Sequence, residues 1–293
     1  MVIQIDQASG LRERVSAAQT FSPVHVVAVS SGKGGVGKTN IVANLAVAGA
    51  KKGFQVMIMD ADLALGNLDV LLGLTPAFTL EDVISGRQGL EDIVVDGPSG
   101  IRILPATSGV QSLTSLTQDQ QLYLQSQFLN LTAPPELLLI DCAAGISENV
   151  LYFSLVAHEV LVVVTPEPTS LTDAYALIKV LSTRYRQKRF RILTNMAKNV
   201  REAKDVFRKL SKVTDRFLSV SLDFAGWVPL DEYVPMAVCQ QKAIVEAFPK
   251  APASRAFTDL VTKCHGWREE HPMNGGLQLF GPSILWTPTQ EGA

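Results

Sequence analysis

Short runs of consecutive apolar residues alternate with stretches of helical periodicity along most of the chain. The runs lie at 26–29, 54–59, 101–104, 137–140, 160–164, 190–194 and 220–228. Apolar strands that alternate with helices are typical of a parallel sheet whose two faces are both covered. The pattern therefore predicts an α/β fold with a doubly wound, mostly parallel sheet flanked by helices on both faces.

The same pattern predicts one domain between two unlike ends. No Pro/Gly/Ser-rich linker interrupts residues 24–265, so we expect a single domain over 23–270, although a domain usually holds ~150 residues. Residues 1–22 are polar and predict a mobile arm, whereas residues 271–293 form a tail rich in Gly and Pro.

Composition narrows the function. The chain of 293 residues is 47% hydrophobic and 18% charged, with a net charge of −2. High hydrophobicity with low net charge excludes intrinsic disorder, and direct nucleic-acid contact is not expected without a basic balance. No apolar run spans a bilayer and the start lacks the order of a signal peptide, which predicts a cytoplasmic protein. The small share of charged residues fits either a sheet covered by helices on both faces or a surface that is largely an interface with other molecules.

A phosphate-binding loop follows the first strand. Gly32, Gly37, Lys38 and Thr39 fit G-x-x-x-x-G-K-[ST] between a predicted strand and a predicted helix over 38–52. Glycines let several backbone N–H groups point at one phosphate, and the helix N-terminus adds positive potential. We expect Lys38 to reach the outer phosphates of ATP or ADP and Thr39 to hold Mg²⁺. The nucleotide site should be lined by Gly34, Gly35, Val36, Gly37, Lys38, Thr39 and Asn40.

A second lysine, Lys33, stands inside this loop. The loop thereby resembles the deviant Walker A motif of the MinD/ParA class of P-loop ATPases. In that class the extra lysine reaches across a dimer interface to the nucleotide of the partner. The resemblance implies that Lys33 is catalytic and makes homodimer formation depend on ATP.

Acidic residues follow two other predicted strands. Asp60 and Asp62 end the run at 54–59, and Asp141 ends the run at 137–140. Carboxylates at the carboxyl ends of parallel strands face the ligand crevice, although a solvated turn is an alternative for the first pair. Resemblance to the class implies that Asp62 positions the attacking water, Asp60 lies near Mg²⁺ and Asp141 binds Mg²⁺ through water. The residues after Asp141, Cys142 and Ala143, depart from the pattern of the class.

The sequence indicates the residues that bind the base less clearly than those that bind the phosphates. Asn195 ends the run at 190–194, where the class places an adenine-binding Asn, and residues 228–231 resemble a segment that lines the adenine. The resemblance adds Pro229 and Asp231 to the candidate site. An ordinary turn is the alternative for each.

The amino-terminal residues 6–12 distinguish members of the class. They resemble the D-Q-A-x-x-L-R motif of the flagellar-number regulators FlhG and FleN, through Asp6, Gln7, Leu11 and Arg12. The resemblance implies that these residues bind the SRP-type GTPase FlhF, where Gln7 could orient water. It also implies a flagellar master transcription activator (FleQ or FlrA) and a C-ring protein as partners. A random polar arm is the alternative.

Two amphipathic helices are candidate surfaces. Residues 201–213 predict either a solvated basic face or a docking surface for a regulatory partner. Residues 254–267, with Ser254 as N-cap and Gly266 at the end, predict a helix that packs on the domain or contacts the membrane peripherally.

Together these features predict a nucleotide-switched ATPase that regulates flagellar number and placement. The nearest alternative is a division-site or partition ATPase of the same class. An iron–sulfur carrier is a further alternative, disfavoured by three scattered cysteines.

Overall fold

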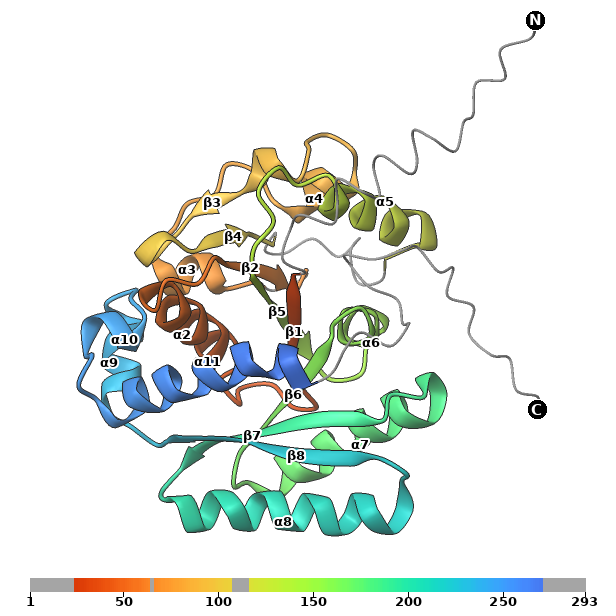
Figure 1. The fold of residues 1–293 in the computed structure, drawn as a ribbon, viewed down its shortest axis with the longest axis vertical. Coiled ribbons are helices and arrows are strands. Elements are labelled where there is room, and N and C mark those ends of the chain that lie inside the picture. The colour runs from red at the N-terminus through yellow and green to blue at the C-terminus, as the bar shows by residue number, and fades with distance from the viewer. Residues whose placement is uncertain (1–23, 64–65, 107–115, 271–293) are drawn as a thin grey trace, which may run out of the picture.

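A computed structural model describes residues 24–63, 66–106 and 116–270. The arm with its candidate residues Asp6, Gln7, Leu11 and Arg12 and the tail after residue 270 lie outside the described residues. The described part is built around one sheet of eight strands (Figure 1).

The sheet has the order β3-β4-β2-β5-β1-β6-β7-β8, in which only β3 runs antiparallel to its neighbour. The strands are β1 (His25–Ser31), β2 (Val56–Ala61), β3 (Val95–Asp96), β4 (Arg102–Leu104), β5 (Leu137–Ala144), β6 (Glu159–Val164), β7 (Arg189–Ala197) and β8 (Ser221–Pro229). The chain builds outward from β1 in both directions, so the end of β1 lies where the strand order reverses. Open α/β sheets bind ligands at such a point.

Helices cover both faces of the sheet. One face packs against α2 (Lys38–Lys51), α3 (Leu68–Leu72), α9 (Tyr233–Cys239), α10 (Ile244–Ala247) and α11 (Pro252–Glu270). The other packs against α4 (Leu80–Ile84), α5 (Gln118–Leu129), α6 (Glu148–Leu155), α7 (Pro168–Tyr185) and α8 (Val200–Phe217). Alternate residues of β1 enter opposite cores: Val27 and Val29 face the first set of helices, and Val26 and Ala28 face the second. The predicted doubly wound sheet is confirmed.

The last helix differs from the prediction. It begins at Pro252 rather than after Ser254, and it continues through Gly266. Ser254 therefore lies inside the first turn and is not the N-cap. Its hydroxyl donates to the carbonyl of Phe248 at 2.8 Å. An exposed glycine is tolerated within a helix at the cost of about 1 kcal/mol, so Gly266 does not end this one.

The apolar face of α11 is buried against α2 and β8. Phe257, Leu260, Val261, Cys264 and Trp267 all belong to the core. Of the two alternatives for this helix, the structure shows the packed one. Among the described helices, none is long and apolar enough to cross a membrane.

Candidate functional site

The loop at residues 32–37 is clamped between two neighbours. A Cβ atom on Gly32 would lie 2.0 Å from the carbonyl oxygen of Asp173 in α7, so the loop lies directly on that helix. On the other side, Gly37 has a φ of 90° and lies against the side chain of Asn195. Both contacts require glycine, which explains why the motif has a glycine at position 32 and another at position 37.

Lys38 begins α2 and points into a buried polar cluster. Its Nζ donates to the Oγ of Ser31 at 3.0 Å. Burial lowers the pKa of Lys38, while the nearby charges of Asp141 and Asp62 act in the opposite direction. The ammonium group is thus a desolvated cation at the end of β1, surrounded by acids.

Two buried carboxylates from the strand ends meet at this point, and the charge of Asp62 acts on both of them. Asp60 and Asp141 are paired across β2 and β5, and Asp60 accepts hydrogen bonds from the backbone of Asp62 at 3.1 Å and Leu68 at 3.4 Å. Burial and the charge of Asp141 raise the pKa of Asp60 well above its ordinary range. Burial likewise raises the pKa of Asp141 to about 6, although a hydrogen bond from Thr39 acts to lower it.

The donor set fits Mg²⁺. Thr39 and Asp141 are in hydrogen-bond contact, and the Oδ1 of Asp141 is buried with no hydrogen-bond partner among the described residues. Mg²⁺ prefers such oxygen ligands and keeps several waters. A cation at this position would satisfy the oxygen and relieve the repulsion between Asp60 and Asp141.

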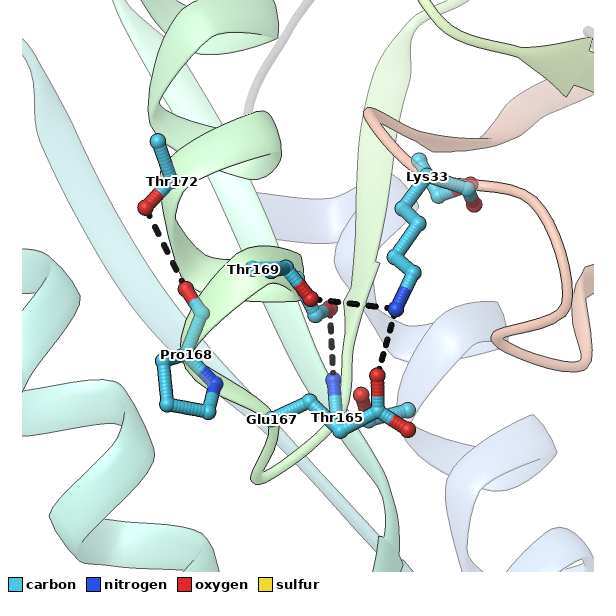
Figure 2. A network of polar contacts seen from close by, with 8 residues as sticks. Lys33, Thr165, Glu167, Pro168, Thr169 and Thr172 are labelled. Carbon is cyan, nitrogen blue, oxygen red and sulfur yellow. Dashed lines mark hydrogen bonds and ion pairs between the residues drawn. The ribbon is translucent and has the colours of Figure 1, made fainter.

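Lys33 points toward the start of α7 (Figure 2). Its Nζ contacts the Oε2 of Glu167 at 2.5 Å and the Oγ1 of Thr169 at 3.0 Å, both at the start of α7. The glycines next to it, Gly34 and Gly35, are exposed, whereas Val36 is buried. The two lysines of the loop thus have separate acidic surroundings.

The candidate base-binding residues divide into two groups. The amide of Asn195 donates to the carbonyl of Val36 at 2.8 Å, so it supports the loop from β7. Pro229 ends β8 beside it, since Ala197 and Pro229 are paired. The carboxylate of Asp231 accepts from the backbone N–H of Tyr233 at 3.0 Å and of Ala253 at 2.9 Å. Both oxygens are therefore engaged in joining α9 to α11.

Sequence patterns did not indicate three residues that shape this site. Ser31 receives the Lys38 hydrogen bond and donates its own to the carbonyl of Lys33 at 2.7 Å. Glu167 and Thr169 lie more than 130 residues from Lys33 in the chain, as their contacts show. Ser31 directly precedes the motif, which begins at Gly32, whereas no local pattern pointed to a contact of Glu167 or Thr169 with Lys33. Asn40 contributes its backbone carbonyl to the amide of Asn44 within α2.

The fold and the loop together define an ATPase of the ParA/MinD class. Residues 23–265 match the ParA family, described as the NUBPL iron-transfer P-loop NTPase, and the chain belongs to this family. The antiactivator FleN of Pseudomonas aeruginosa is 48% identical over 94% of this chain and 98% of its own length. The chain is thus FleN-like within the class.

Two further similarities agree with this placement. The flagellum site-determining protein YlxH of Helicobacter pylori is 30% identical over 94% of this chain and 95% of its own length. The solved structure of the MinD cell division protein from Aquifex aeolicus has a TM-score of 0.68 and 25% identity, covering 83% of this chain and 97% of that one.

Proposed function

We propose that this ATPase is a molecular switch whose ATP-bound state is a homodimer and which controls the number and placement of flagella. The observation that carries the switch is Lys33, a second loop lysine held apart from the buried acids that surround Lys38. The similarity to FleN and YlxH supports the flagellar role. In a switch of this kind the output is a change in partner affinity between two states.

The buried cluster supports a division of labour in hydrolysis. Lys38 binds the outer phosphates of ATP, and Thr39 and Asp141 hold Mg²⁺ with Asp60 beside them. Bound Mg²⁺ neutralises charge on the phosphates. Asp62, whose charge acts on the pKa values of Lys38, Asp60 and Asp141, orients the attacking water. Lys33 of each protomer reaches the nucleotide of the other.

The backbone from Gly34 to Thr39, with Asn40 behind it, cradles the phosphates. Asn195 and Pro229 then line the base, because β7 and β8 end beside the loop. The segment at Asp231 contributes its backbone rather than its carboxylate, which the contacts to Tyr233 and Ala253 occupy.

Partner binding is assigned to two regions. Asp6, Gln7, Leu11 and Arg12 contact an SRP-type GTPase of the FlhF kind. The basic helix α8 binds the transcription activator or the C-ring protein: beside it lies a depression of about 510 Å³ whose lining includes Arg201, Lys204 and Phe224. The word antiactivator in the name of the FleN relative supports an activator as one partner.

The protein works in the cytoplasm under this proposal. The apolar face of α11 is buried in the core, so peripheral contact with the inner membrane surface would need another part of the chain.

The family description also raises iron transfer. Cys142 and Cys264 are buried and Cys239 alone is exposed among the three cysteines of the chain. Iron–sulfur clusters are held by four Cys thiolates, so a cluster shared between two protomers needs two accessible thiols from each. Burial of two of the three thiols therefore favours the switch over an iron carrier.

The flagellar part of the proposal is tested with the arm alone. A peptide of residues 1–20 is added to an FlhF-type GTPase, and GTP hydrolysis is measured. We expect stimulation, and loss of stimulation when Gln7 is replaced by Ala in the peptide. A rate unchanged by the native peptide would remove the assignment of the arm to this partner.

A further inference from the structure

We propose that Glu167 and Thr169 restrain Lys33 against its own protomer, so that Glu167 raises the ATP concentration that dimer formation requires. This inference rests on the proposed function, because it assumes that Lys33 acts across a dimer interface. It assigns Glu167 and Thr169 as positioning residues that act through Lys33.

The restraint is a pair of specific contacts to one ammonium group. Lys33 Nζ lies 2.5 Å from Glu167 Oε2 and 3.0 Å from Thr169 Oγ1, so two of its three donors are engaged within the same chain (Figure 2). A lysine side chain cannot keep both contacts and also reach a second protomer. Dimer formation must therefore break them.

The acceptors are held in place by the start of α7. Glu167 directly precedes Pro168, the first residue of the helix, where the positive end of the helix favours a carboxylate. Behind it, the backbone N–H of Thr165 donates to the Oγ of Ser170 at 3.0 Å, which fixes the turn (Figure 2). The carboxylate is thus presented to Lys33 by a rigid segment.

The backbone of Lys33 is also fixed, which leaves the side chain as the moving part. Gly32 lies so close to Asp173 that a Cβ atom would be 2.0 Å from its carbonyl oxygen. Ser31 donates to the Lys33 carbonyl at 2.7 Å. Release of Lys33 is therefore a rotation of its side chain away from Glu167, with no movement of the loop.

The contact is weak enough to be reversible. The side chains of Lys33 and Glu167 are 36% and 63% exposed, and solvent screens ion pairs of this kind. Losing one such pair shifts an equilibrium by about 1.4- to 5-fold. A symmetric dimer breaks two, so the dimer dissociation constant should change by about 2- to 25-fold. The phosphates of ATP, with their higher charge, can compete for Lys33 across this range.

The test is sedimentation velocity of the full chain, titrated with Mg²⁺ and the non-hydrolysable ATP analogue AMP-PNP. Glu167→Gln should reach half-dimer at a lower analogue concentration than wild type. Thr169→Val should shift it in the same direction by less. Asp215→Asn, which removes an exposed acid from α8, should match wild type. The difference between Glu167→Gln and wild type should shrink at 0.5 M salt, since screening weakens surface ion pairs.

The outcomes separate this inference from the proposal beneath it. Equal thresholds for wild type and Glu167→Gln, or a higher threshold for the variant, would overturn the restraint while the ATP-dependent dimer stands. Monomers for every variant at saturating analogue would overturn both.

Discussion

At the scale of single residues, the site is dominated by acids that the fold forces together. Asp60 and Asp141 are neighbours across two parallel strands and both are buried. Their pKa values are raised by burial, that of Asp141 to about 6. A raised carboxyl pKa means that the folded protein holds protons more tightly than the unfolded chain, in which an Asp titrates near ~3.9. The ionised pair therefore destabilises the metal-free protein.

A pH dependence of stability follows. Because the folded pKa of Asp141 is raised, its unfavourable contribution is present at pH 7.5 and is relieved as the pH falls through about 6. We expect Asp141→Asn to raise the Tm of the protein in EDTA, relative to wild type, more at pH 7.5 than at pH 5.5. Thermal unfolding of both proteins at the two pH values measures this. A Tm difference that is the same at both would contradict the account of the acid pair.

Local sequence patterns predicted where most of the site residues lie, but not the contact that holds Lys33. That Lys38, Thr39 and Asp141 lie close together was predictable, because each belongs to a pattern tied to a strand end or a helix start. Glu167 was not, because its meeting with Lys33 depends on how α7 packs beside the loop, which no pattern within either segment encodes. The contact of Asp231 with Ala253 was not predictable for a similar reason, because Ala253 lies in a helix that returns from 22 positions further along.

At the scale of elements, α11 shows that an apolar stripe alone does not determine what the helix packs against. Its periodicity fitted both packing on the domain and contact with the membrane. The structure buries the stripe against α2 and β8. Trp267 closes the contact, since the guanidinium of Arg191 lies 4.7 Å from its ring centre and pairs with the buried Glu159 at 3.1 Å. The helix therefore braces the end of the sheet that holds β6, β7 and β8.

Truncating Trp267 should accordingly destabilise the fold. The side chain is 5% exposed, and removing a buried Trp costs about 3–5 kcal/mol. Phe217→Ala is the matched control, because Phe217 is 62% exposed at the end of α8 and surface changes stay within about 0.5 kcal/mol. Urea unfolding of both variants measures the difference. Equal stabilities would show that α11 does not brace the sheet.

At the scale of the whole molecule, the low charge of the sequence has a structural explanation. Both faces of the sheet are covered, so its strands are apolar throughout, as the alternation of β1 between two cores shows. The strand pattern was sufficient to predict this architecture. The strand pattern did not predict β3, because this antiparallel edge strand has only two residues and is too short to show a periodic pattern.

The sheet also explains how one nucleotide could govern the whole protein. The phosphate loop leaves β1 where the strand order reverses, with β2 and β5 supplying the acids on one side and β7 supplying Asn195 on the other. A ligand bound at this point contacts both halves of the sheet. It also lies beside Lys33, whose side chain is the part free to turn outward to a second protomer.

The central claim is that ATP converts monomers to dimers through Lys33 and that Asp62 returns them by hydrolysis. Sedimentation velocity with ATP and Mg²⁺ tests it most directly. Lys33→Ala should remain monomeric, Asp62→Ala should accumulate dimer, and Asp69→Ala, whose carboxylate bonds the backbone of Val70 within α3, should behave as wild type. Dimer formation by Lys33→Ala at the wild-type ATP concentration would contradict the account.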